Sequence, residues 1–344
     1  MAKKKAIYNL PKEDLSAFIE TIGESKFRVE QIWKGLYKQM WTSWDSFTNL
    51  PYSLRKLLDD AFSLKHLFPS RTMRSQDNST QKVLFELVDS AKIESVLIQH
   101  SRRNTLCISC QSGCGIGCAF CATGSMGLTR NLDKAEIIEQ VLYFARFLEA
   151  SQKQLTNIVV MGMGEPFMNY LNTMGALKII NNPEGLNFGA RRITISTIGI
   201  LPNLYRFLSE NIQINLAISL HAPNNKIRNQ LVPINEKYPI DDLFLFCKEY
   251  TQKTHRRISF EYILIDAIND SLDDANELSQ RLNNMLCHVN LIPYNPSPFF
   301  QWKRPPIVKI RKFQSILREN GIPATIRASE GIEIQAGCGQ LTTS

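Results

Sequence analysis

Three cysteines lie close together in a loop of small residues, where they could hold one inorganic centre. Cys114, Cys118 and Cys121 follow the spacing C-x3-C-x2-C. Thiolates this close in sequence converge on one site, and sulfur ligands favour iron–sulfur clusters or zinc. A structural zinc site needs a fourth ligand, usually from a second C-x2-C pair or from paired histidines, and neither lies nearby at such a spacing. A three-thiolate site with one open coordination position therefore fits this loop better.

Two further thiols could take part in chemistry. Cys338 lies between Gly337 and Gly339, where a cysteine has little packing reason to exist. We therefore expect a flexible thiol that other groups can reach. Cys107 is the natural second thiol, because it lies on an expected strand just before the cysteine loop.

Polar groups that could bind a ligand follow the expected strands, at the edge where ligands sit in parallel sheets. Glu165 offers a carboxylate that could accept from an ammonium group, and Gly162 and Gly164 would let a ligand approach the backbone closely. Later strands are followed by Ser196, Ser219, Leu220, His221 and Asn295. Each could be only a turn or cap residue, but their shared position at strand ends supports a binding function equally well.

Strand and helix patterns alternate from residue 104 onward and indicate a parallel sheet of about six strands. The expected strands are 105–109, 158–161, 193–196, 214–219, 258–264 and 289–292. Helical patterns separate them at 171–180, 201–208, 240–252 and 272–286, and Asp133 with Glu136 forms a capping-box pattern before another helix. An open or partial (βα)6 barrel, an α/β fold, agrees with this count.

The first part of the chain has a different pattern. Apolar residues at helical spacing predict a helical module within residues 12–65, and its basic residues could grip phosphates, although a solvated face is the commoner meaning of such charges. The polar segment 74–80 is predicted to be a linker, and 82–88 with 93–98 to be a hairpin. We divide the chain into three parts. These are a helical accessory module for RNA binding (1–72), a linker with a hairpin (73–100) and a catalytic domain with a cysteine tail (101–344).

Composition points to a soluble cytoplasmic protein. The 344 residues are 44% hydrophobic and 21% charged, and no apolar run is long enough to span a bilayer. The segment after the N-terminal lysines is too short and too polar for a signal peptide, so we expect no membrane association. Eight cysteines in a reducing compartment suggest metal binding or catalysis before structural disulfides. A net charge of +8 favours a polyanionic partner such as nucleic acid, although charge alone is weak evidence.

The motifs together resemble a known family. The cysteine loop, with Phe120 before its third cysteine, resembles the radical S-adenosylmethionine (SAM) superfamily, whose fold is a partial (βα)6 barrel. Further segments resemble the RlmN family over nearly the whole chain: 105–107, 162–166, 219–223, 232–235 and 338–341. That family methylates carbon 2 of an adenine in the peptidyl-transferase centre of 23S rRNA, and of the adenosine next to the anticodon in some tRNAs.

The resemblance implies a role for each candidate residue. Cys114, Cys118 and Cys121 would hold a [4Fe–4S] cluster, and SAM would be bound by Gly164, Glu165, Ser196, Ser219, Leu220, His221 and Asn295. One SAM would methylate Cys338, and a second would be cleaved to a 5′-deoxyadenosyl radical that removes hydrogen from the methyl group. The resulting methylene radical would add to the ring carbon, and Cys107 would resolve the adduct through a disulfide with Cys338. Glu94 matches the position of a proton acceptor in the family. Two alternatives stay open: Cys107 could take the proton itself, and Glu94 could be a surface carboxylate without a catalytic role.

Two other functions are consistent with the sequence. The related Cfr enzymes methylate carbon 8 of the same rRNA adenine, but Pro166 favours the RlmN family. A non-catalytic iron–sulfur or zinc RNA-binding module is the other alternative, although binding alone has no use for the thiols of Cys107 and Cys338. Under the enzyme hypothesis we expect an electron donor such as flavodoxin with its reductase, and a monomer. Cys110 is an extra thiol that could compete with Cys107.

Overall fold

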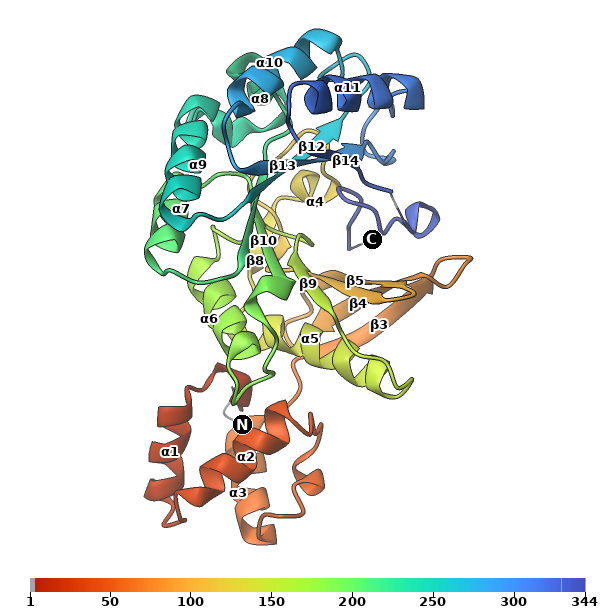
Figure 1. The fold of residues 1–344 in the computed structure, drawn as a ribbon. Coiled ribbons are helices and arrows are strands. Elements are labelled where there is room, and N and C mark those ends of the chain that lie inside the picture. The colour runs from red at the N-terminus through yellow and green to blue at the C-terminus, as the bar shows by residue number, and fades with distance from the viewer. Residues whose placement is uncertain (1–3, 329, 344) are drawn as a thin grey trace.

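A ten-stranded mixed sheet runs through the computed structural model, which describes residues 4–328 and 330–343. Its strand order is β14-β13-β12-β11-β10-β9-β6-β5-β4-β3. β6 and the strands from β9 to β14 are parallel, and β5, β4 and β3 extend one edge in antiparallel pairing. Because β14 and β3 do not pair with each other among the described residues, the parallel part is an open barrel, as predicted (Figure 1).

The alternation of strands and helices is confirmed. The parallel strands are β6 (Arg103–Ile108), β9 (Asn157–Val160), β10 (Ile193–Thr197), β11 (Asn215–Ser219), β12 (Ile258–Leu264), β13 (Cys287–Pro293) and β14 (Ala324–Ile326). The larger helices between and after them are α5 (Lys134–Glu149), α6 (Tyr170–Asn181), α7 (Leu201–Ser209), α9 (Ile240–Thr254), α10 (Leu272–Leu282) and α11 (Ile307–Glu319), which lie outside the sheet in Figure 1. Sequence reasoning missed β14, α11 and the short α8 (Asn225–Leu231), and it extended α10 too far.

The two faces of the parallel strands differ in polarity. Residues such as Leu106, Ile158 and Ile195 are fully buried in the apolar core. Their neighbours Thr105, Asn157, Thr194, Asn215 and Ser259 line a cavity instead. The period-two alternation therefore builds a hydrophobic outer face under the helices and a polar inner face.

The N-terminal residues form a helical body, as predicted. Its helices are α1 (Lys12–Thr21), α2 (Phe27–Tyr37) and α3 (Tyr52–Ala61) (Figure 1). The short strands β1 (Lys5–Ala6) and β2 (Phe62–Ser63) pair with each other in parallel. The apolar stripe of α2 is buried. Lys38 donates to the carbonyl of Pro183 at 2.7 Å, so this body touches the connection after α6. No helix among the described residues has the length and apolar character needed to cross a bilayer.

The predicted linker is wrong. β3 (Leu67–Arg74) and β4 (Thr80–Leu87) form an antiparallel hairpin, and the segment between them is its turn. Oδ1 of Asp77 accepts from Oγ of Ser75 at 2.6 Å and from the backbone of Ser79 at 3.0 Å. Linkers and tight turns share the same polar residues, which is why composition misled us. The predicted hairpin of β4 and β5 (Lys92–His100) is confirmed.

Candidate active site

A cavity of about 150 Å³ lies at the carboxyl ends of the parallel strands. It brings together most of the predicted site residues: Cys114, Cys118, Cys121, Gly164, Glu165, Ser196, Ser219, His221 and Cys338. Leu220, Asn295, Cys107 and Glu94 are not among the side chains that line it. The three loop cysteines and the tail cysteine, more than two hundred positions apart in sequence, therefore share one cavity.

The cysteine loop is closed by its own backbone. It runs from β7 (Gln111–Gly113) to the one-turn helix α4 (Ala122–Ser125) and on to β8 (Leu128–Asn131), which pairs with β7. Gly113 has φ 73°, and a Cβ there would collide with the carbonyl oxygen of Gly127. That carbonyl instead accepts from the N–H of Cys114 at 2.8 Å. Glycine at position 113 is needed for this close approach.

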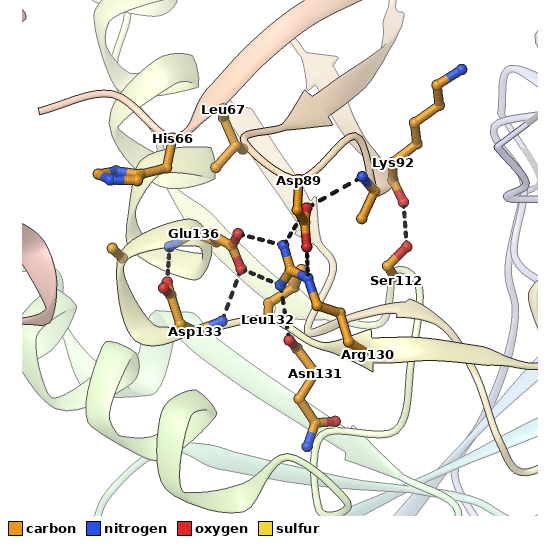
Figure 2. A network of polar contacts seen from close by, with 12 residues as sticks. His66, Leu67, Asp89, Lys92, Ser112, Arg130, Asn131, Leu132, Asp133 and Glu136 are labelled. Carbon is orange, nitrogen blue, oxygen red and sulfur yellow. Dashed lines mark hydrogen bonds and ion pairs between the residues drawn. The ribbon is translucent and has the colours of Figure 1, made fainter. Parts of the chain in front are cut away.

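The strands that flank the loop are braced from outside (Figure 2). The guanidinium of Arg130 donates to both oxygens of Glu136 at 2.8 Å and to Oδ1 of Asp89 at 2.9 Å. Glu136 also completes the predicted capping box with Asp133 at the start of α5. The Arg130 guanidinium lowers the pKa of Asp89 to about 2. Oγ of Ser112, on β7, donates to the carbonyl of Lys92 at 2.8 Å. Ser112 therefore attaches β7 to the β4–β5 hairpin, and Arg130 attaches β8 to it.

Glu165 is a buried carboxylate at the end of β9. Its Oε1 accepts from Oγ1 of Thr197 at 2.6 Å and from the N–H of Phe167 at 2.8 Å, and its Oε2 accepts from the N–H of Ile198 at 2.8 Å. Burial raises its pKa to about 7, against the lowering effect of these three donors. A cation bound beside it would favour the ionised form.

The glycines next to Glu165 also let two segments of the chain approach each other closely. A Cβ on Gly162 would lie 2.7 Å from Oγ of Ser109, and one on Gly164 would lie 2.5 Å from Cβ of Gln111. The close approach that these glycines permit is therefore between two segments of the chain. Both glycines still line the cavity, so a ligand can contact them there.

Polar groups at the ends of β10 and β11 form the far wall. The hydroxyls of Ser196 and Ser219 lie 3.0 Å apart. Nδ1 of His221 accepts from the N–H of Ile263 at 3.1 Å, which puts the ring proton on Nε2. Burial, with a smaller contribution from the positive charge of Arg228, lowers the pKa of His221 to about 3, so the ring is neutral.

Arg228 is a structural residue that sequence reasoning missed. It is fully buried in α8 and donates to the carbonyls of Leu220 (3.0 Å) and Ile198 (2.6 Å) and to Oδ1 of Asn235 (2.8 Å). Leu220, predicted to contact SAM, is itself buried and contributes its carbonyl to this contact. Arg228 therefore fixes the loops that follow β10 and β11.

The tail that carries Cys338 is docked on the cysteine loop. The N–H of Ala122 donates to the carbonyl of Gly339 at 2.8 Å, and Oγ1 of Thr123 donates to that of Leu341 at 2.7 Å. Nδ2 of Asn295, predicted to contact SAM, donates to the carbonyl of Cys338 at 3.2 Å. Cys338 is exposed, and because it lines the cavity its thiol can be reached there. Loss of solvation within the cavity raises its pKa.

Cys107 lies on the inner face of the sheet, paired with Val96 of β5 and Val159 of β9. Burial, and next the nearby thiol of Cys338, raise its pKa to about 12. All eight cysteines are free, so the predicted disulfide is not formed in this structure. Cys110 is 1% exposed and packs in the core.

Glu94 is not a surface carboxylate. Its side chain is 4% exposed and its Oε1 lies 2.9 Å from Nζ of Lys82, which is equally buried. Loss of solvation raises its pKa, although Lys82 opposes the shift. The alternative of a surface carboxylate at Glu94 is therefore wrong.

Comparison with known proteins identifies the family. Residues 108–278 match the model of the radical SAM superfamily, and residues 6–64 match that of the ribosomal RNA large subunit methyltransferase N-terminal domain. The chain is 46% identical over 338 residues to a probable dual-specificity RNA methyltransferase RlmN of Staphylococcus carnosus, covering 98% of this chain and 93% of that protein. The chain belongs to the RlmN family. An RlmN relative from Bacillus anthracis is 44% identical, again covering 98% of this chain and 93% of that protein.

A solved structure agrees with this membership of the RlmN family. The crystal structure of a radical SAM methyltransferase from Sphaerobacter thermophilus matches with a TM-score of 0.96 and 47% identity, covering 99% of this chain and 100% of that one. RlmN proteins, as members of the radical SAM superfamily, use a [4Fe–4S] cluster and SAM.

The residues present fit such a cluster. The fit does not come from a ready-made site for a metal ion, because no group of three or more His, Cys, Asp or Glu side chains among residues 4–328 and 330–343 could hold one. The fit rests instead on the donor set, since three free thiols of one loop line one cavity beside Glu165. Thiolates are the ligands that iron–sulfur clusters take.

A second and larger cavity adjoins the first. It measures about 1110 Å³, is bounded by the polar inner face of the sheet, and shares Met161 and Glu261 with the smaller cavity. Its lining includes Arg103, Arg191, Arg256, Arg257 and Arg327, none of which forms an ion pair among the described residues. Sequence reasoning found the net positive charge but not this concentration of it.

Proposed function

We propose that this protein methylates carbon 2 of adenine in RNA through a methyl-cysteine intermediate on Cys338. Its substrates would be 23S rRNA, at the peptidyl-transferase centre, and tRNA, at the adenosine next to the anticodon. The observation that carries the proposal is that the thiol of Cys338 shares one cavity with Cys114, Cys118 and Cys121. The relatives from Staphylococcus carnosus and Bacillus anthracis, which are probable dual-specificity RNA methyltransferases, support methylation of RNA.

The cavity offers a place for each cofactor. Cys114, Cys118 and Cys121 would hold the [4Fe–4S] cluster, which when bound supplies the electron that cleaves SAM to a 5′-deoxyadenosyl radical. Glu165 would accept from the SAM ammonium group, whose charge would keep the carboxylate ionised despite its raised pKa. The paired hydroxyls of Ser196 and Ser219 and the Nε2–H of His221 would bind other polar atoms of SAM.

The two thiols would act in turn. Sγ of Cys338 would take the methyl group of one SAM and lose its proton, leaving S-adenosylhomocysteine. The positive sulfonium of SAM would favour the thiolate, offsetting the raised pKa of Cys338. Once the methylene carbon is bonded to carbon 2 and the adduct has lost one electron and the carbon 2 proton, the thiolate of Cys107 would attack Sγ of Cys338 and form a disulfide. The Sγ–CH2 bond would break, and the methylene carbon would keep its electron pair and take a proton to become the methyl group of the released base. An external thiol or a reductase would then reduce that disulfide.

The large cavity would receive the RNA. Five arginines without carboxylate partners suit a phosphate backbone, which dominates RNA affinity. Arg257 and Arg327 donate no side-chain hydrogen bond to another described residue, so both remain available to phosphates. An extruded adenine could pass Met161 and Glu261, which both cavities share, to reach Cys338. The helical body would add affinity, and the catalytic part would include the whole ten-stranded sheet from β3 onward.

The chemistry of the reaction supports a cellular compartment and an electron donor for this protein. Free thiols and a reducible cluster suit the cytoplasm, with an electron donor such as flavodoxin and its reductase. We also propose that the protein acts as a monomer.

The product decides between the candidate functions. The cluster is reconstituted anaerobically, and the protein is incubated with SAM, reductant and unmodified 23S rRNA fragment or tRNA before mass spectrometry of the nucleosides. We expect 2-methyladenosine, whereas 8-methyladenosine would indicate a Cfr-like enzyme. SAM cleavage without a methylated base would refute the substrates, and RNA binding without SAM cleavage would indicate a binding module. Cys338→Ala is the matched control, since it should cleave SAM without methylating RNA.

A further inference from the structure

A buried ion pair lies beside the tail that carries the thiol. Nζ of Lys82, on β4, is 2.9 Å from Oε1 of Glu94, on β5, and the two side chains are 3% and 4% exposed. Removing two charges from water is costly unless each is paired and its other donors or acceptors are also used. The remaining partners of Lys82 and Glu94 therefore indicate what the pair does.

Each member of the pair holds one end of the tail. Nζ of Lys82 also donates to the carbonyl of Gln335 at 3.2 Å, before Cys338 in the chain. The N–H of Thr342, after Cys338, donates to Oε2 of Glu94 at 2.9 Å. Gln335 has φ 54°, a left-handed conformation that a residue other than glycine keeps only when its surroundings hold it. The pair thus closes the segment 335–342 at both ends.

The position of Glu94 does not suit direct proton transfer from the base. Neither Glu94 nor Lys82 lines the cavity that Cys338 lines. Both carboxylate oxygens of Glu94 already accept from groups of the protein, Nζ of Lys82 and the N–H of Thr342. A general base must come within hydrogen-bond reach of the proton that it removes, directly or through one water.

We propose that the Lys82–Glu94 pair is a clamp that positions Cys338, and that Glu94 serves methyl transfer through this clamp rather than by accepting the ring proton. The proposal rests on the proposed function, because that function gives Cys338 its task. Glu94 and Lys82 are then positioning residues with equal importance. Loss of either should release the segment 335–342.

The first test measures release of the tail and needs no RNA. Lys82→Met and Glu94→Gln should each raise the rate of Cys338 alkylation by iodoacetamide about tenfold, because release of the tail moves the thiol out of the cavity, where the reagent can approach it from more directions. The rate is read by mass spectrometry of the Cys338 peptide. The double variant Lys82→Met/Glu94→Leu leaves no unpaired buried charge, so it should fold and show the same increase. Unchanged alkylation in this folded double variant would overturn the clamp.

A matched control is available in the same fold. Glu139 is also a buried carboxylate that pairs with a basic side chain, His66, and accepts from the N–H of Leu67. Glu139→Gln should leave Cys338 alkylation at the wild-type rate. An equal increase in this variant would mean that general loosening, and not loss of the clamp, raises the alkylation rate.

The second test separates a clamp from a proton acceptor. Methylation of Cys338 by SAM alone precedes any proton removal from RNA, so a clamp variant should already be slowed about tenfold at this step. Lys82→Met and Glu94→Gln should behave alike and accumulate no covalent protein–RNA adduct on denaturing gels. If Glu94→Gln methylates Cys338 normally but accumulates the adduct, while Lys82→Met does not, Glu94 is the acceptor and the clamp is wrong. If the wild type never methylates Cys338, the proposed function fails, and the alkylation rates still decide whether the pair holds the tail.

Discussion

The cysteine loop closes on itself, whereas the thiol tail is held by side chains from distant elements. The loop turns at Gly113, pairs β7 with β8 and is braced by Arg130 (Figure 2). The tail takes its position from Lys82, Glu94, Thr123 and Asn295. The cluster site is therefore encoded locally, and the position of the methyl-carrying thiol is encoded by the assembled fold.

The largest expected effect separates the chemistry of the two segments. Cys118→Ala should abolish both SAM cleavage and RNA methylation, because the cluster loses a ligand. Cys338→Ala should lower RNA methylation on the order of a thousandfold or more while SAM cleavage persists. Both activities are measured on the same reconstituted preparation. Residual methylation near the wild-type rate in Cys338→Ala would contradict the role of the tail.

A smaller effect should weaken the loop and spare the tail. Arg130→Met removes donors from Glu136 and Asp89 and should lower the free energy of unfolding by about 1–2 kcal/mol. The loss is kept small because the guanidinium is 31% exposed and partly screened by solvent. Iron content after reconstitution should fall, while Cys338 alkylation stays unchanged.

Arg281 provides the control for the Arg130 variant. It is 28% exposed and pairs with Asp241 far from the loop in sequence, so Arg281→Met removes a similar contact. Its iron content should match that of the wild type. Equal iron loss in both variants would mean that Arg130 has no special connection with the cysteine loop.

A change at the contact between the loop and the tail should loosen the tail. Thr123→Val removes the buried hydrogen bond to the carbonyl of Leu341, at a cost of about 1 kcal/mol. Cys338 alkylation should rise by roughly fivefold, in proportion to that loss. Ser125→Ala, which removes a hydroxyl bonded to Ala122 within α4, should leave Cys338 alkylation unchanged.

The smallest effect concerns pH. Because the pKa of Asp89 is lowered to about 2 by Arg130, its contribution to stability is present above the unfolded pKa, near 4, and is lost as the pH falls toward 2. The difference in unfolding free energy between wild type and Arg130→Met should therefore be constant from pH 5 to pH 8 and shrink below pH 4. Urea denaturation across this range measures it. A difference that grows in acid would contradict the assigned pair.

The features predicted best from the sequence are those whose residues lie close together along the chain. The cysteine spacing, the capping box of Asp133 and Glu136, and the strands that end at Glu165 and Ser219 needed only local patterns. The open parallel barrel followed from the regular alternation of strands and helices.

What the sequence could not predict depends on contacts between distant residues. Nothing near Lys82 or Arg228 in the sequence indicates that their charges are buried, since partners such as Gln335 and Ile198 are found only in the fold. Asn295 follows a strand as expected, but its amide holds the tail. The turn at 74–80 has the composition of a linker, and only the pairing of β3 with β4 distinguishes the two.

The central claim, that Cys338 carries the methyl group, can be tested by following the carbon. The protein is first incubated with SAM bearing a ¹³C-methyl group, freed of that SAM, and then given RNA with unlabelled SAM for a single turnover. We predict that the methylated adenine of this first turnover contains the ¹³C atom and that the Cys338 peptide loses it. A first product that contains only unlabelled methyl carbon would show that SAM methylates the base without Cys338, and would contradict the account.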